Sequence, residues 1–154
     1  MERPVIIGTG IDIVEIDRVR RLGERYGERF LDRVFTPGER ARCTVRRDPW
    51  PSLAARLAAK EAGMKCLGLG LDTASWHDFE VTSRPGERPR LALAGRAAAR
   101  AQQLGVGGLW VSLSHSRHYA VAHVVAAGAP PCGGERPVSG PGASATEMAA
   151  EGRS

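Results

Sequence analysis

Two kinds of hydrophobic pattern alternate along this chain. Residues 4–14 form a run rich in β-branched side chains, which is typical of a strand. Apolar residues then recur at helical spacing over residues 16–35, where Gly23 and Gly27 are expected to weaken the helix or split it in two. The same reasoning predicts helices over residues 39–47, 53–67 and 95–104, and strands over residues 76–83, 90–93, 109–114 and 119–125. This order of elements indicates an α+β fold.

The helix over residues 53–67 is the clearest of these elements. It is rich in alanine and leucine, Ser52 precedes it as a candidate N-cap, and Gly68 and Gly70 follow it as a stop signal. Gly63 lies inside this helix, where glycine costs about 1 kcal/mol relative to alanine. Gly63 is therefore expected to weaken this helix unless its small size serves packing.

Large apolar side chains become rare after residue 127. Residues 128–154 consist mostly of small and polar residues, and such a segment buries too little surface to offset its ordering entropy. We therefore expect one domain over residues 1–127 and a flexible tail over residues 128–154. The sequence has no apolar run of membrane-spanning length, and its first residues lack the apolar core of a signal peptide. These features predict a cytoplasmic protein that does not enter a membrane.

Charge and composition narrow the class of partner. The net charge of +5 suits an acidic partner, which includes nucleic acid, a phosphate-rich cofactor or an acidic protein. Aromatic residues make up only 5% of the chain, which is a poor platform for stacking bases and argues against nucleic acid. The three cysteines are widely spaced and predict neither a zinc site nor a disulfide framework. A basic nucleotide- or nucleic-acid-binding module without catalysis remains one alternative.

Charged side chains interrupt the alanine-rich helix at two pairs of positions. Arg56 and Lys60 are four residues apart, as are Glu61 and Lys65, and such pairs stack on adjacent turns. We expect all four to share a stripe beside the core face, where one carboxylate and three cations would suit Mg²⁺ and a polyphosphate. The alternative is an ordinary solvent-exposed ion pair worth a few tenths of a kcal/mol.

Two further polar features stand out against apolar surroundings. Asp12 lies in the first strand, where a carboxylate is either on an exposed face or held for a purpose such as a metal. Gly8 and Gly10 in the same strand suggest a close backbone approach or a bulge. Ser112–His118 forms a polar hairpin between two apolar strands, and a lone Ser-His pair there is more typical of turn chemistry than of a nucleophile.

Taken together, three segments resemble the holo-acyl-carrier-protein synthase family of 4′-phosphopantetheinyl transferases. The family motifs are similar to Gly8–Asp12, to Leu57–Lys65 and to Ser112–His115, in the same order and over residues 4–127. The resemblance implies an antiparallel sheet packed with a long central helix. It also implies Mg²⁺-dependent transfer of 4′-phosphopantetheine from coenzyme A to a serine of an apo acyl carrier protein, in fatty-acid or polyketide synthesis.

The resemblance also implies residue roles. Asp12 and Glu61 would bind Mg²⁺, and Lys65 would join Glu61 as a catalytic residue by neutralising the pyrophosphate. The general base is left open among Glu61, a metal-bound water and Glu39. The coenzyme A site would comprise Arg56, Lys60, Lys65, Ser114 and His115, and the carrier would dock on Arg18, Arg29 and Phe30. The family type is a homotrimer with interfacial active sites, and residues 109–113 and 119–125 would line the interface.

Overall fold

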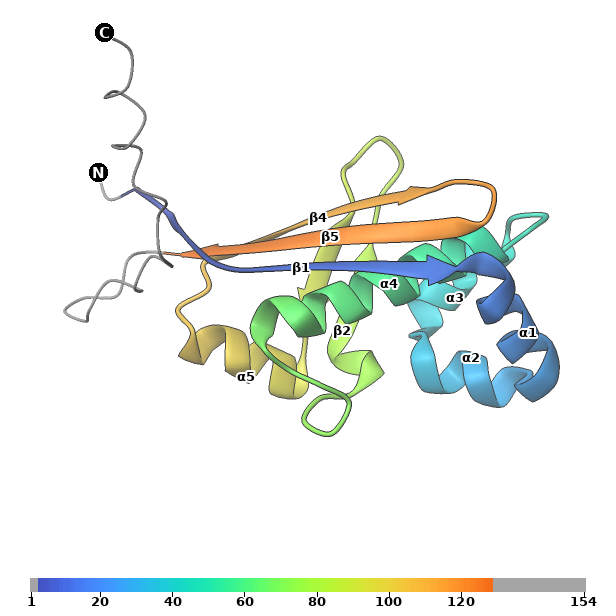
Figure 1. Ribbon diagram of the computed structural model, residues 1–154, viewed down its shortest axis with the longest axis horizontal. Coiled ribbons are helices and arrows are strands. Elements are labelled where there is room, and N and C mark those ends of the chain that lie inside the picture. Colours follow the sequence, from blue (N-terminus) through green and yellow to red (C-terminus); the bar gives the residue numbers. More distant parts are fainter. Residues whose placement is uncertain (1–2, 129–154) are drawn as a thin grey trace, which may run out of the picture.

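The computed structural model describes residues 3–128 of the chain and forms two antiparallel sheets and five α-helices within that range (Figure 1). In chain order the elements are β1 (Val5–Glu15), α1 (Ile16–Tyr26), α2 (Glu28–Val34), α3 (Pro37–Thr44), α4 (Trp50–Leu67), the 3₁₀ turn η1 (Trp76–Asp78), β2 (Phe79–Thr82), β3 (Arg90–Leu93), α5 (Gly95–Gln103), β4 (Gly108–His115) and β5 (Tyr119–Gly128). This order agrees with the predicted α+β class. The predicted strand over residues 76–83 is shorter because its first turn is η1.

The larger sheet has the strand order β1-β5-β4, and the smaller sheet pairs β2 with β3. The last strand, β5, is central and pairs antiparallel with β1 on one side and with β4 on the other. Helix α4 runs along one face of the larger sheet (Figure 1). The predicted antiparallel sheet with a long central helix is therefore confirmed.

The opposite face of the larger sheet is exposed and largely apolar. Ile11 and Ile13 of β1 are 62% and 66% exposed, and Trp110 of β4 and Tyr119 of β5 are 57% and 51% exposed. In the strand register, His123 of β5 lies between Ile11 and Ser112 on this face. We refer to Ile11, Ile13, Trp110, Tyr119 and His123 as the outer face. An apolar sheet surface of this kind is typical of a site where another molecule packs.

Glycines bring β1 directly against the backbone of α4. A Cβ atom at Gly10 would lie 1.9 Å from the carbonyl oxygen of Ala62, and one at Gly8 would lie 2.2 Å from that of Cys66. No side chain fits at either position, so the close backbone approach predicted for this strand is confirmed. The contact places Asp12, two residues after Gly10, beside α4.

Gly63 has a packing reason for its place inside α4. A Cβ atom there would come within 2.9 Å of the side chains of Phe79 and Leu91, which belong to β2 and β3. The missing side chain lets the smaller sheet pack closely on the helix. The gain in packing therefore offsets the cost of placing glycine inside a helix.

The helix boundaries differ from the predicted ones at two places. Helix α4 begins at Trp50, so Ser52 lies within its first turn, and the carboxylate of Asp48 accepts a hydrogen bond of 3.2 Å from the Trp50 amide instead. Gly27, with a φ of 56°, separates α1 from α2. Gly23 stays inside α1, where its missing side chain makes room for the Trp50 ring, 2.1 Å from the position of a Cβ atom.

The end of the described chain is part of the larger sheet. Gly128 is the last residue of β5 and pairs with Val5 of β1, so the folded unit extends one residue beyond the predicted boundary. The predicted flexible tail otherwise lies outside the described residues. Among residues 3–128, no helix is both long and apolar enough to cross a membrane.

Candidate active site

Asp12 and Lys65 form an ion pair between β1 and α4. The Lys65 Nζ donates to Asp12 Oδ1 at 2.7 Å and to the carbonyl oxygen of Ile11 at 3.1 Å. The Asp12 side chain is 12% exposed, whereas that of Lys65 is 57% exposed. The Lys65 side chain is thus accessible to a ligand, while the Asp12 carboxylate is mostly buried.

Glu61 lies on the side of α4 that faces β1, beside Asp12. Burial, followed by a hydrogen bond and the negative charge from Asp12, raises the pKa of Glu61 to about 7, with Arg18 and Lys65 opposing the shift. Two carboxyl groups this close resist simultaneous ionisation in the absence of a cation. Asp12 Oδ2 is also buried and has no hydrogen-bond partner. An orphaned carboxylate oxygen beside a second carboxyl group is an arrangement that a cation would stabilise.

The donor set fits a hard divalent cation. Mg²⁺ prefers oxygen ligands, keeps several waters, and is often held by one or two carboxylates together with substrate phosphates. Asp12 and Glu61 supply two carboxylates, and among residues 3–128 there is no group of three or more His, Cys, Asp or Glu side chains that could hold a metal. The remaining ligands would therefore come from water and substrate. The residues present fit the Mg²⁺ that the sequence predicted.

The predicted stripe of three cations beside Glu61 is wrong. Lys60 is fully buried and forms an ion pair of 2.8 Å with Glu39, so it is not available to bind phosphate. Arg56 is half-buried, donates from Nη1 to the Ser52 carbonyl at 3.2 Å, and has an Nε atom that is buried without a partner. Because each helical residue turns by about 100°, Arg56 and Lys65, nine residues apart, lie on opposite sides of α4.

The remaining predicted residues lie at two other places. Ser114 and His115 are exposed at the end of β4, next to the β4–β5 hairpin. Arg18 and Arg29 are exposed on α1 and α2, and Phe30 is partly buried against Phe35, with ring centroids 6.1 Å apart. Since Arg18 lowers the pKa of Glu61, the first turn of α1 also borders the carboxylate pair.

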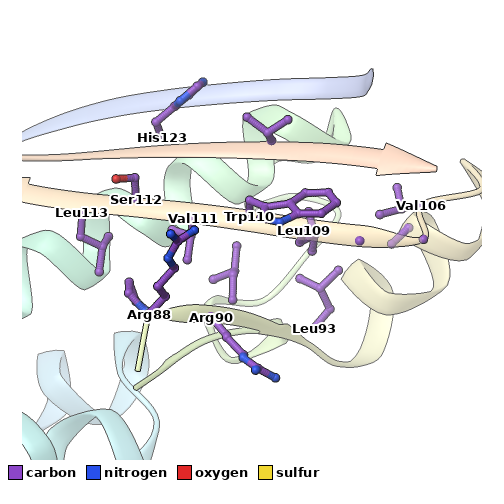
Figure 2. Close-up of a pocket in the computed structure, with 16 residues that line it drawn as sticks. Arg88, Arg90, Leu93, Val106, Leu109, Trp110, Val111, Ser112, Leu113 and His123 are labelled. Carbon is purple, nitrogen blue, oxygen red and sulfur yellow. The ribbon is translucent and has the colours of Figure 1, made fainter. Parts of the chain in front are cut away.

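A groove of about 970 Å³ runs along β4 and was not predicted from the sequence (Figure 2). It combines apolar side chains such as Leu109 and Trp110 with two arginines, Arg88 and Arg90. Figure 2 shows the Arg88 side chain directed toward β4 and that of Arg90 directed away from it. Arg88 lies in the turn before β3, and Arg90 is the first residue of β3. The approach of Arg88 to β4 depends on the tertiary packing of the two sheets.

Comparison with known proteins identifies the class to which this fold and site belong. Residues 8–124 match the model of the 4′-phosphopantetheinyl transferase superfamily. The chain is 53% identical over 117 residues to a holo-[acyl-carrier-protein] synthase of Moorella thermoacetica, covering 76% of this chain and 91% of that protein. It is 47% identical over 122 residues to the synthase of Koribacter versatilis, covering 79% and 98%.

A solved structure supports the same conclusion. The crystal structure of the Helicobacter pylori holo-[acyl-carrier-protein] synthase in complex with coenzyme A superposes with a TM-score of 0.68 at 31% identity, covering 77% of this chain and 98% of that one. The chain therefore belongs to the 4′-phosphopantetheinyl transferase superfamily. It is an enzyme of the transferase class, and the similarity predicted from its three motifs is confirmed, with holo-[acyl-carrier-protein] synthases as its near relatives.

Proposed function

We propose that this enzyme transfers 4′-phosphopantetheine from coenzyme A to a serine of an apo acyl carrier protein. The serine oxygen bonds to the β-phosphorus, the bond joining the two phosphates breaks, and 3′,5′-ADP leaves. The observation that carries this proposal is the pairing of Asp12 and Glu61 with Lys65 at the contact between β1 and α4. The names of the relatives, holo-[acyl-carrier-protein] synthases, support the acyl carrier protein as one substrate. The structure of one such synthase in complex with coenzyme A supports coenzyme A as the other.

Each of these side chains has a role in the proposed reaction. Asp12 and Glu61 would hold Mg²⁺, which when bound would neutralise charge on the pyrophosphate and the leaving group. The exposed Lys65 ammonium lies close enough to share in that neutralisation. Glu39 is excluded as the general base because it is buried and bonded to Lys60 and two backbone amides. We propose that Glu61 orients a water that accepts the proton of the serine.

A second copy of the chain would complete the site. Arg56 lies across α4 from the carboxylate pair, so a coenzyme A molecule that met both within a single chain would have to wrap around the helix. The outer face supplies an apolar surface through which copies could associate. We therefore propose a homotrimer in which Arg56, Ser114 and His115 meet the 3′-phosphate or adenosine end of coenzyme A bound at a neighbouring chain.

The proposed docking surface for the carrier lies on α1 and α2. Arg18 and Arg29 are exposed there, and Phe30 is the adjacent partly buried apolar residue. Cationic guanidinium groups suit an acidic carrier helix and would speed its association at low salt. We expect the reaction to take place in the cytoplasm, and the buried free thiols of Cys43 and Cys66 fit a reducing compartment.

Intact-mass measurement tests the proposed reaction. Incubation of the enzyme with coenzyme A, Mg²⁺ and apo carriers of fatty-acid and polyketide type should add one phosphopantetheine to at least one carrier. The matched control is a carrier whose acceptor serine is replaced by alanine, which should gain no mass. If no apo carrier gains mass while a known transferase modifies the same samples, the proposed function is wrong.

A further inference from the structure

Lys60 and Glu39 form a buried network that the proposed reaction does not use. The Lys60 Nζ donates to Glu39 Oε2 at 2.8 Å and to the carbonyl oxygens of Trp76 and Phe79 at 2.9 and 2.7 Å. Glu39 also accepts from the amides of Thr36 and Val81, at 3.0 and 2.8 Å. Both charged side chains are fully buried. The network thus joins α3, α4, η1 and β2 at one point in the interior.

A buried ion pair of this kind is poor evidence for stability alone. Removing two charges from water is expensive, and apolar replacements of similar volume are often as stable or more so. Here all three protons of the ammonium group have acceptors, and both carboxylate oxygens have donors. Hydrogen bonds constrain the angle between two groups as well as their distance, whereas apolar packing does not, so a network with every donor and acceptor paired fixes orientation. The network therefore contributes by fixing the orientation of α4.

The geometry connects the network to the carboxylate pair. Lys60 and Glu61 are consecutive residues of α4, so their side chains point about 100° apart around the helix axis. Lys60 reaches toward α3 and β2, whereas Glu61 lies beside Asp12 of β1. On the β1 side, Gly8 and Gly10 bring the strand close to the helix but offer no side chain that interlocks with it. One turn further along, the half-exposed Lys65 hydrogen-bonds to Ile11 and Asp12 of β1, whereas the buried directional contacts of α4 beside Glu61 are those of Lys60.

The effect of a small rotation is large enough to matter. Side chains reach about 5–6 Å from a helix axis, so a rotation of about 20° would move the Glu61 carboxylate by about 2 Å. A displacement of about 1 Å in a catalytic constellation can lower a rate by about 100-fold. A fixed helix rotation is thus a requirement for Asp12 and Glu61 to share one cation.

We propose that the Lys60–Glu39 pair is a positioning device that sets the rotation of α4 and thereby holds Glu61 against Asp12. The inference rests on the proposed function, because the consequence of the positioning is read at the cation site. Lys60 itself touches neither substrate nor cation. It acts through the backbone of the helix that carries Glu61.

Direct cation binding and steady-state kinetics test this role together. In Lys60→Met, Mn²⁺ affinity measured by electron paramagnetic resonance in the presence of coenzyme A should fall about 10-fold, and kcat should fall by about 10- to 100-fold. The KM for the carrier should stay within about 3-fold of wild type, because docking does not involve α4 rotation. Val34→Ala is the control, since it removes buried atoms from α2 without touching the hydrogen-bonded network. Its melting temperature should fall while Mn²⁺ affinity and kcat do not.

Glu39→Gln is the second variant, because it preserves side-chain size if Lys60→Met does not fold. All measurements are made at a temperature where circular dichroism shows each variant to be folded. Retained Mn²⁺ affinity and kcat in a folded Lys60→Met or Glu39→Gln protein would overturn the positioning role, and so would failure of both variants to fold, which would assign the pair to stability. A wild-type protein that neither binds Mn²⁺ nor transfers phosphopantetheine would instead overturn the proposed function together with the inference.

Discussion

Glu61 has an environment unlike that of an ordinary surface carboxylate. Its neighbour four positions along, Lys65, would make an unremarkable helix ion pair, but Lys65 instead bonds to Asp12. Burial and the proximity of Asp12 leave Glu61 with a pKa of about 7. The charge state of this one side chain therefore changes within the physiological pH range, and two predictions follow from its direction.

The dependence on Mg²⁺ should vary with pH. A carboxyl group must be ionised to bind the cation, so lowering the pH from 8 to 6, through the Glu61 pKa of about 7, should raise the Mg²⁺ concentration for half-maximal activity about tenfold. Transfer assays titrated with MgCl₂ at each pH, with saturating coenzyme A and carrier, measure this. A half-maximal concentration that does not change between pH 8 and 6 would contradict the assignment of Glu61 as a ligand.

Replacement of Glu61 should separate stability from activity. Because the folded-state pKa of Glu61 is raised, its favourable contribution to folding is present below the unfolded-state pKa and is lost as pH rises through about 7. In EDTA, Glu61→Gln should therefore melt at a higher temperature than wild type at pH 8 and at a similar one at pH 4. Its kcat should fall at least about 100-fold. The exposed Glu24→Gln variant is the control and should match wild type in both measurements.

At the scale of elements, the contact between β1 and α4 determines whether a site exists. At Gly8 and Gly10 no side chain separates the strand from the helix backbone, so Asp12 and Glu61 meet although they are about fifty residues apart in the sequence. The smaller sheet packs on the far side of α4 through Gly63. The helix is therefore held closely on two sides by positions that lack a Cβ atom.

Gly10→Ala should damage both folding and catalysis. The added Cβ would lie 1.9 Å from the Ala62 carbonyl oxygen, so the strand must move away, at a cost of about 1–3 kcal/mol in the free energy of unfolding. Urea denaturation and the transfer assay measure the two effects, and activity should fall beyond the loss of folded protein because Asp12 moves with the strand. Gly107→Ala is the matched control, since its Cβ would meet the nearest atom at 3.7 Å. Equal behaviour of the two variants would contradict this account of the contact.

At the scale of the whole molecule, the outer face and the position of Arg56 support the same assembly. The apolar residues of the outer face would be buried between copies, and Arg56 would be brought to the carboxylate pair of a neighbour rather than of its own chain. The groove along β4 includes His123 and Trp110 of this face, so its shape would also depend on the assembly.

Ile13→Glu should convert a trimer into monomers and reduce transfer activity. Ile13 is 66% exposed in the single chain, so a charge there should leave the fold intact but oppose burial between copies. Light scattering coupled to size-exclusion chromatography gives the mass, and the transfer assay gives the activity. Val45→Glu, at a site that is 83% exposed and away from the outer face, should remain trimeric and active. A fully active Ile13→Glu monomer would show that the site does not need a second copy.

Much of this protein is determined by its sequence alone. The order of strands and helices follows from periods of two and 3.6 residues, and the close approach of β1 follows from Gly8 and Gly10 beside a β-branched run. The motifs around Asp12, Glu61 and Ser114 also sufficed to indicate the family. Local patterns are reliable here because each depends on the conformation of a short stretch of backbone.

Only the tertiary structure decided which face of α4 each charged residue occupies. Apolar and small residues surround this helix on most sides, so no single stripe marks its core face, and Lys60 could not be told from Glu61 by spacing. Burial of Lys60 depends on Glu39, twenty-one positions earlier, and the raised pKa of Glu61 depends on Asp12, which is even farther away in the sequence. Electrostatic energies are set by distance and by burial, and both are properties of the packed chain.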